Sequence, residues 1–238
     1  MAPLRCLIVN ADDFGQSRGV NAGVIDAHDR GIVTSASLMV RWPAAIEAVE
    51  MQRTRPSLSL GVHLDLGEWA YRDGEWVPRY EVVRLDAVEE VADEIERQVA
   101  RFVELVGAPP THIDSHQHVH LRPPVREAAL AVAERIGAPL RHFTPDVRYC
   151  GEFYGQDTEG KPLHHMIEPA ALKRILYGIP PGITELACHP GHYGDVESTY
   201  RVERAIEVRT LCDQSLRKLL QSEGIVLSSF AGTALPRS

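Results

Sequence analysis

Short apolar runs alternate with amphipathic stretches along almost the whole chain, and this alternation constrains the fold more than any other feature. Apolar and β-branched runs predict seven strands, at 4–10, 34–40, 58–66, 111–115, 139–143, 182–189 and 224–230. Between them, apolar residues recur three and four positions apart, which predicts helices at about 17–31, 43–53, 86–107, 123–137, 168–178 and 199–222. Strands and helices that alternate in this way typically form a parallel sheet covered by helices.

We therefore predict an α/β fold, a single-domain TIM-like (β/α) barrel of seven strands over residues 1–238. Two segments depart from the pattern. Residues 67–84 contain Asp73-Gly74 between aromatic flanks, which predicts a β-hairpin, and residues 145–166 are irregular. An open doubly wound sheet is the alternative fold, but the segment after the first strand, NADDFGQSRG, lacks the glycine pattern of a phosphate-binding loop.

Charge and composition limit the partners. The net charge of -8 argues against nucleic acid or an anionic membrane, because both reward clustered Lys and Arg. No apolar run approaches the roughly 20 residues of a membrane span, and the apolar run at the N-terminus is too short for a signal peptide. The four cysteines form no CxxC pair, which is typical of reduced thiols in a cytoplasmic protein. We expect a small-molecule substrate, and the sequence leaves a homodimer open.

Acidic and histidine residues finish four of the seven predicted strands. In barrels and open α/β sheets, reactive groups gather at the carboxyl ends of strands. A functional site is therefore expected where these ends meet, built from Asp12, Asp13, His63, Asp65, Asp114, His116 and His189.

The stretch HIDSHQHVH, residues 112–120, has a histidine or an aspartate at every second position. In an extended strand His112 and His120 would lie roughly 26 Å apart, whereas the ligands of one ion converge to about 2.0–2.2 Å from it. One strand therefore cannot supply all four histidines to one metal. The strand should reach the rim near His116, which is the expected ligand; His118 could be a second ligand, and His112 is better explained as a core histidine.

Four motifs, VNADDFGQSRGVNAGVIDAHDRGIVTSASLMV, LGVHLDL, PTHIDSHQHVH and LACHPG, resemble the YdjC/ChbG family of carbohydrate deacetylases. They occur in the family's order and cover nearly the whole chain. The resemblance implies a (β/α) barrel that removes N-acetyl groups from amino sugars such as those of chitin oligosaccharides, diacetylchitobiose among them, with one divalent metal ion.

By the family pattern, Asp13, His63 and His116 match the metal ligands, Asp12 matches the catalytic base, and His189 resembles the general acid. Imidazole ligands favour zinc, while magnesium is also associated with the family, so the expected cofactor is one Zn²⁺ or Mg²⁺ ion. The competing interpretation of Asp12 or Asp13 is a cap of the helix that begins near Ser17.

Substrate contacts are expected from residues near the predicted rim. Asp65, His118 and Tyr193 could bind sugar hydroxyls, and Arg41-Trp42 stands where the family commonly has an asparagine. Aromatic residues of the hairpin segment could form a platform for sugar rings or simply pack the hairpin; they are Trp69, Tyr71, Trp76 and Tyr80, with Trp42 nearby.

Amide hydrolysis requires help for a poor electrophile and a poor nucleophile, and a metal with an open coordination position can polarise the carbonyl and activate water. Asp12 would then take the proton of the water, and His189 would protonate the departing amine.

Two other classes of function stay open: a metal-dependent phosphoesterase or amidohydrolase on a similar barrel, and a non-catalytic sugar-binding barrel. Phosphoesterases and amidohydrolases of this kind usually carry His-x-His on the first strand or ligands for two metals, whereas this first strand supplies only carboxylates.

Overall fold

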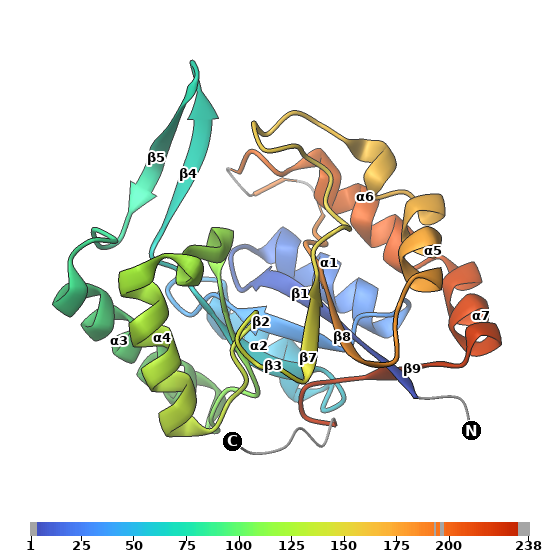
Figure 1. Ribbon diagram of the computed structural model, residues 1–238, viewed down its shortest axis with the longest axis horizontal. Coiled ribbons are helices and arrows are strands. Elements are labelled where there is room, and N and C mark those ends of the chain that lie inside the picture. Colours follow the sequence, from blue (N-terminus) through green and yellow to red (C-terminus); the bar gives the residue numbers. More distant parts are fainter. Residues whose placement is uncertain (1–3, 193, 196–197, 233–238) are drawn as a thin grey trace.

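Seven parallel strands form one curved sheet in the computed structural model, which describes residues 4–192, 194–195 and 198–232 (Figure 1). The strand order is β6-β3-β2-β1-β8-β7, and β9 also pairs with β1. One edge of β1 pairs with β8 over Arg5–Ala11. Its other edge pairs first with β9, over Arg5–Ile8, and then with β2, over Asn10–Phe14. The strands are β1 (Arg5–Phe14), β2 (Ser35–Leu38), β3 (Ser59–Leu64), β6 (Ile113–Ser115), β7 (Val147–Cys150), β8 (Gly182–Cys188) and β9 (Ile225–Ser228).

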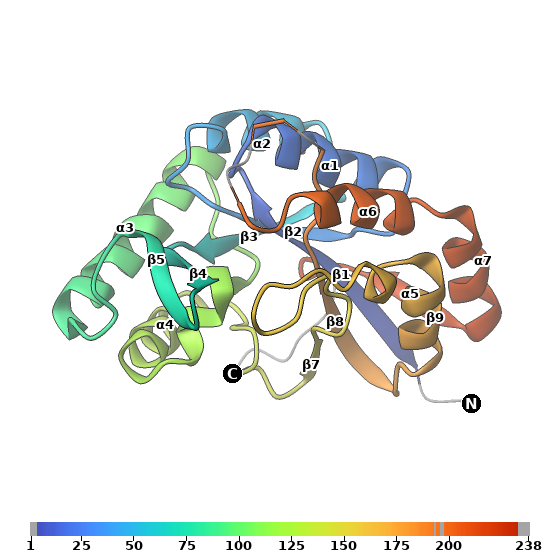
Figure 2. The ribbon, with the colours of Figure 1, turned by 90° about the horizontal axis from the view of Figure 1, so that it is seen from above.

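The helices form an arc around the outside of the curved sheet (Figure 2). They are α1 (Arg18–Asp29), α2 (Ala45–Arg53), α3 (Val88–Val106), α4 (Pro123–Ile136), α5 (Pro169–Tyr177), α6 (Val202–Leu211) and α7 (Gln214–Glu223), with short 3-10 turns η1 (His116–Leu121) and η2 (His164–Met166). The predicted parallel α/β architecture is confirmed. A closed seven-stranded TIM barrel is not: among the described residues, the ladder beyond β6 continues only as an isolated bridge between Ile113 and Leu140, which leaves a half-barrel.

The fifth predicted strand, residues 139–143, was wrong. Only Leu140 bridges to β6, because Pro139 has no backbone N–H, the Leu140 N–H bonds Thr144 Oγ1, and His142 has a left-handed φ of 68°. The strand that continues the sheet is β7, which lies within the segment predicted to be irregular and pairs with β8. The turn at His142 follows directly on Arg141, whose side chain enters the site described below.

The long helix predicted at 199–222 is two helices, α6 and α7, with a break at Cys212 and Asp213. The Asp213 carboxylate accepts a hydrogen bond from the Ser215 N–H and so caps α7. Aspartate at this position is an N-cap signal, but the continuous apolar periodicity on both sides concealed it.

The hairpin expected near 67–84 consists of β4 (Gly67–Arg72) and β5 (Glu75–Glu81), which pair antiparallel. Asp73 and Gly74 at its turn both have positive φ, 50° and 91°, as a tight two-residue hairpin turn requires. Figure 1 shows the hairpin projecting from the body beside the carboxyl ends of the strands.

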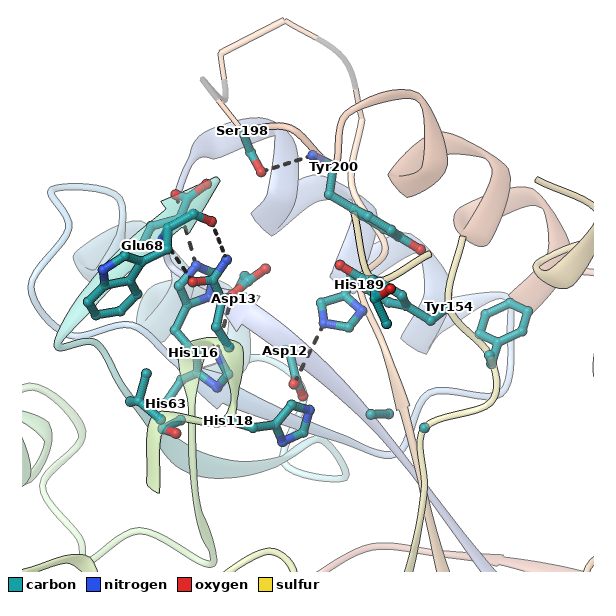
Figure 3. Close-up of a pocket in the computed structure, with 18 of the residues that line it drawn as sticks. Asp12, Asp13, His63, Glu68, His116, His118, Tyr154, His189, Ser198 and Tyr200 are labelled. Carbon is teal, nitrogen blue, oxygen red and sulfur yellow. Dashed lines mark hydrogen bonds and ion pairs between the residues drawn. The ribbon is translucent and has the colours of Figure 1, made fainter. Parts of the chain in front are cut away.

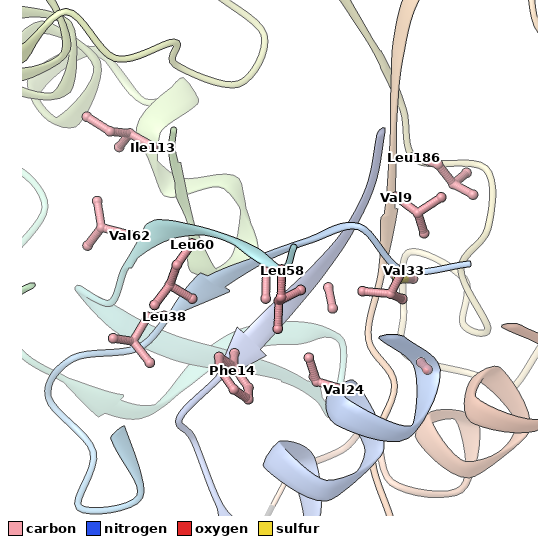
Figure 4. Packing of buried hydrophobic residues seen from close by; sticks show 14 of the residues in the cluster. Val9, Phe14, Val24, Val33, Leu38, Leu58, Leu60, Val62, Ile113 and Leu186 are labelled. Carbon is pink, nitrogen blue, oxygen red and sulfur yellow. The ribbon is translucent and has the colours of Figure 1, made fainter. Parts of the chain in front are cut away.

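Alternation along β1 separates the core from the site. Leu7, Val9 and Ala11 are fully buried in the apolar cluster between the sheet and the helices, part of which is drawn in Figure 4. Asn10 and Asp12 lie on the other face of the strand, because successive side chains point to opposite sides. The polar inner face of the half-barrel therefore begins at these two residues. None of the described helices is long and apolar enough to cross a membrane.

His112 lies in the wall of the half-barrel. Its ring stacks on Phe230 with centroids 3.9 Å apart, and Thr111 Oγ1 lies 3.0 Å from its Nδ1. A Cβ added at Gly61 of β3 would come within 2.4 Å of the ring, so only glycine leaves room for it. Burial lowers the pKa of His112 to about 4, so the ring is neutral at neutral pH.

His112→Asn should make the protein less sensitive to acid. The unfolded state takes up a proton on His112 near pH 6.5 and the folded state only near pH 4, so the stabilisation is complete above pH 6.5 and is lost as the pH falls. The free energy of unfolding of the wild type should fall by about 2 kcal/mol more than that of the variant between pH 7 and pH 5, measured by urea titration. Equal pH slopes for the two proteins would contradict this assignment.

Candidate active site

The adjacent carboxylates Asp12 and Asp13 reach the same cavity because β1 is irregular where they lie. The pairing of β1 with β2 shifts register between Ala11 and Phe14, and Asp13 has a left-handed φ of 65°, which aspartate tolerates better than most residues. The break in the extended strand therefore begins at Asp13. Ser17 caps α1 by accepting from the Val20 N–H, so neither carboxylate is needed as the helix cap.

Asp13, His63 and His116 meet at the carboxyl ends of β1, β3 and β6 (Figure 3). Asp13 Oδ1 lies 2.9 Å from His116 Nδ1 and 3.2 Å from His63 Nε2. All three side chains are buried, and one ligand atom of each lies within 4.8 Å of the others. The predicted metal ligands are thus brought together from β1, β3 and the start of η1, directly after β6.

Asp114 holds His63 in place. Its Oδ1 lies 2.8 Å from His63 Nδ1, which leaves Nε2 directed at Asp13. Burial alone would lower the pKa of His63, but Asp114, Asp13 and Asp12 outweigh it and raise that pKa to about 10. Asp114 was noted only as a strand-end residue; its alternation with His112 and His116 was the available signal for a role beside them.

The donor set fits a divalent ion. One carboxylate and two imidazoles are ligands that zinc and related ions accept, and a carboxylate behind a ligating histidine is a common supporting contact. The carboxylates outweigh burial and raise the pKa of both histidines, so the position between them favours positive charge. Among the described residues, His116 Nε2 is also buried without a hydrogen-bond partner, 3.9 Å from Glu68 Oε2.

Arg141 binds Asp12 through two hydrogen bonds, from Nη1 to Oδ2 at 2.7 Å and from Nη2 to Oδ1 at 2.8 Å. The same guanidinium contacts Asp114 at 2.8 Å and Glu185 at 2.7 Å. Burial would raise the pKa of Asp12, but Arg141 outweighs it, and the pKa is lowered. Asp12 is therefore an oriented, ionised carboxylate. Arg141 was not among the predicted site residues, although a lone arginine in the apolar run PLRHF was a signal.

His189 follows β8 and faces Asp12, with Nε2 3.8 Å from Asp12 Oδ2. Its ring lies between Tyr154 and Tyr200, and its backbone N–H donates to the Glu207 carboxylate. Burial lowers the pKa of His189 to about 4 although Asp12 and Asp13 act in the opposite direction. The ring is therefore neutral at neutral pH.

Helix α6 supplies a second buried cation. Arg204 Nη2 donates to Asp13 Oδ2 at 2.6 Å, on the oxygen that does not face the histidines. Burial would raise the pKa of Asp13, but Arg204 and His116 hold it well below its usual value. No local sequence pattern pointed to Arg204, because the contact joins residues 191 positions apart.

A cavity of about 700 Å³ opens above these groups, in the range of small-molecule sites. Trp69 and Trp76 of the hairpin line one side, and Phe153 and Tyr154 from the segment after β7 line another. Asp12, Asp13, His63, His116 and His189 all line it, so the five catalytic and metal candidates share one cavity.

Comparison with known proteins identifies the family. A family model of YdjC-like proteins matches residues 6–222. This chain belongs to the YdjC-like family. It is 33% identical, over 264 aligned positions, to the chitooligosaccharide deacetylase of Serratia marcescens, covering 95% of this chain and 98% of that protein. The family resemblance stated from the motifs is thereby confirmed.

Two solved structures support the fold. A crystal structure from Enterococcus faecalis, of a protein proposed to cleave cellobiose phosphate, matches this YdjC-like chain with a TM-score of 0.77 and 28% identity, over 96% of this chain and 98% of that one. A family 4 carbohydrate esterase from Streptomyces lividans matches with a TM-score of 0.58 and 10% identity, over 95% and 93% of the two chains. At that identity the second match speaks for the fold alone.

Three of the five expected substrate contacts of this YdjC-like chain do not line the cavity. The Asp65 carboxylate is fully buried and accepts hydrogen bonds from Trp42 Nε1 at 3.0 Å and Tyr80 Oη at 2.9 Å, with Arg41 Nη1 at 3.4 Å. Asp65, Arg41 and Trp42 therefore anchor the hairpin, because their polar groups are bound to one another. Of the other two, His118 lines the cavity, and Tyr193 lies outside the described residues.

The aromatic residues of the hairpin divide between the two expected roles. Trp69 and Trp76 line the cavity, and Arg122 lies over the Trp69 ring at 5.4 Å. Tyr80 packs edge-on against Trp42 with centroids 5.8 Å apart, beside Asp65. Packing therefore accounts for Trp42 and Tyr80, and the two hairpin tryptophans stay available to a ligand.

Proposed function

We propose that this chain is a metal-dependent carbohydrate deacetylase that hydrolyses the acetamido group of N-acetylglucosamine-containing oligosaccharides such as diacetylchitobiose. The observation that carries the proposal is Asp12, ionised and oriented by Arg141, between the Asp13–His63–His116 cluster and His189 in one cavity. The chitooligosaccharide deacetylase of Serratia marcescens, similar over almost the whole of both chains, supports the substrate class.

Asp13, His63 and His116 would hold one divalent ion, and the two imidazoles favour Zn²⁺ over Mg²⁺. Such an ion supplies the electrophilic help that an amide carbonyl needs and lowers the pKa of water. Asp114 and Arg204 would keep two of its ligands in position, through His63 Nδ1 and Asp13 Oδ2.

Asp12 is the proposed base. Its lowered pKa keeps it ionised at neutral pH, and each carboxylate oxygen keeps lone-pair capacity beyond its bonds to Arg141. It would accept the proton of the water that attacks the amide carbon. Arg141 is the proposed positioning residue, because it fixes both Asp12 oxygens.

His189 is the proposed acid, and it must first receive a proton, because its low pKa leaves it neutral. The short gap between Asp12 Oδ2 and His189 Nε2 offers a route for the proton that Asp12 has taken from water. His189 would pass it to the sugar nitrogen as the C–N bond breaks. The products are acetate and the free amino sugar, and both residues return to their starting state.

Acetate release tests the proposal directly. The protein, with added Zn²⁺ or Mg²⁺ and with a chelator, should be assayed on N-acetylglucosamine, diacetylchitobiose, longer chitin oligomers and a phosphate monoester. We expect metal-dependent acetate release from the chitin sugars. His116→Ala should abolish it and lose bound metal, because one ligand of the cluster is gone.

The matched control is His165→Ala, which removes an exposed histidine. Its activity should equal that of the wild type. Hydrolysis of the phosphate ester instead of the acetamido sugars would favour the phosphoesterase alternative. Sugar binding without hydrolysis would favour the non-catalytic one.

A further inference from the structure

A second group of histidines lies beside the site just described. One ring nitrogen from each of His118, His120 and His142 lies within 4.8 Å of the other two. None of these residues belongs to the Asp13–His63–His116 cluster. His118 and His120 come from η1, and His142 comes from the turn that ends the short pairing with β6.

The spacing suits a single ion. His118 Nδ1 and His142 Nε2 lie 3.4 Å apart. Two nitrogens about 2.1 Å from one tetrahedral ion would lie about 3.4 Å from each other. His142 is exposed, so an ion can reach the group from solvent.

The His120 ring has the orientation of a metal ligand. Its Nδ1 lies 2.5 Å from Ser115 Oγ, which also accepts the His120 backbone N–H. Its Nε2 is buried and has no hydrogen-bond partner among the described residues. A buried ring nitrogen without a partner costs free energy unless something binds it. A metal-ligating histidine usually makes a polar contact through its other ring nitrogen, as His120 Nδ1 does with Ser115.

The backbone is constrained at the same place. His118 and His142 both have left-handed φ, 52° and 68°, although neither is glycine. Conformations of this kind cost energy and cluster at functional sites, where the surroundings hold them.

We propose that His118, His120 and His142 form a second metal site, separate from the Asp13–His63–His116 cluster and selective for Zn²⁺ or a similar transition ion. Three imidazoles without a carboxylate suit such ions and not Mg²⁺ or Ca²⁺. The two groups share no ligand, so they would hold two separate ions and not a bridged pair.

An ion at this second site would stiffen the cavity wall. His118 lines the cavity, and its Nε2 lies 3.1 Å from the Tyr149 hydroxyl. The Tyr149 ring in turn covers the Arg141 guanidinium at 5.1 Å. The second site is therefore linked through Tyr149 to the residue that orients Asp12. It does not depend on the deacetylase proposal.

Metal stoichiometry tests the second site without any activity assay. Protein stripped with a chelator and then freed of it should be titrated with Zn²⁺, and separately with Co²⁺, whose visible absorption reports nitrogen ligands. Bound metal should be measured by elemental analysis after gel filtration. We expect two Zn²⁺ per wild-type chain, and one in His118→Asn and in His142→Asn.

Asparagine is chosen because it tolerates the left-handed backbone at both positions, so that either variant can keep the fold, which circular dichroism checks. His165→Asn, at an exposed histidine, should keep two ions, and His116→Ala should lose the other one. Partial loss of cobalt absorption in His142→Asn and in His116→Ala, each keeping the part that the other loses, would support two independent sites. One ion per wild-type chain, or two ions unchanged in both asparagine variants, would overturn the proposal.

Discussion

Asp12→Asn should lower the rate of acetate release by about 10²- to 10⁴-fold, the usual contribution of a positioned general base. The asparagine amide keeps the shape of the carboxylate and can still accept from Arg141, but it cannot take a proton from water. Asp12 is not part of the Asp13–His63–His116 cluster, so metal bound there should be unchanged. The loss should fall on kcat more than on KM, because the base acts in the chemical step.

Asp146→Asn is the matched control, since it makes the same change at an exposed aspartate. It should leave kcat and metal content at wild-type values. If Asp12→Asn kept wild-type turnover, Asp12 would not be the base. If it lost metal along with activity, Asp12 would belong among the ligands.

Arg141→Met should lower the free energy of unfolding by about 3–5 kcal/mol at pH 8, because it leaves buried carboxylates without their cation. The side chains of Arg141, Asp12, Asp114 and Glu185 are all almost completely buried. Urea titration of metal-free protein gives the difference. Arg148→Met, at an exposed arginine of β7, is the matched control and should stay within about 0.5 kcal/mol of the wild type.

The cost of Arg141→Met should shrink as the pH falls towards 5. In the wild type, Arg141 keeps the pKa of Asp12 and Asp114 below the usual value despite burial, so these groups stay ionised in the fold at pH 5. Without Arg141, burial would raise their pKa, and protonation at lower pH would relieve the unpaired charge. A cost equal to that of Arg148→Met, or one that did not change with pH, would show that the buried ion pairs contribute little.

The sequence was a good guide to elements with strong local periodicity and to residues at strand ends. Asp13, His63 and His116 could be expected together because parallel strands present their carboxyl ends at one edge. The contacts that orient these three side chains could not be predicted from the sequence. Asp114 and His63 are 51 positions apart, and Arg204 and Asp13 are 191 apart, so no local pattern joins them.

The errors also have local physical causes. Asp65 lies two positions after His63, and strict alternation would point both side chains inward. However, β3 ends at Leu64, so the alternation no longer applies and Asp65 turns to Trp42 and Tyr80. The predicted strand at 139–143 failed in the same way, because apolar composition could not reveal the left-handed turn at His142.

The hairpin β4–β5 and the parallel sheet differ in how far their sequences can change. The groups proposed for chemistry lie on or directly after β1, β3, β6 and β8, whose positions are fixed by the parallel sheet and the core beneath it. Trp76 sits on a ribbon that is tied to the body near its base, through Tyr80 and Asp65. Between this contact and its turn, the hairpin can gain, lose or exchange residues without changing any strand pairing of the parallel sheet. Related chains can therefore differ in this ribbon while they keep the sheet and the groups proposed for chemistry.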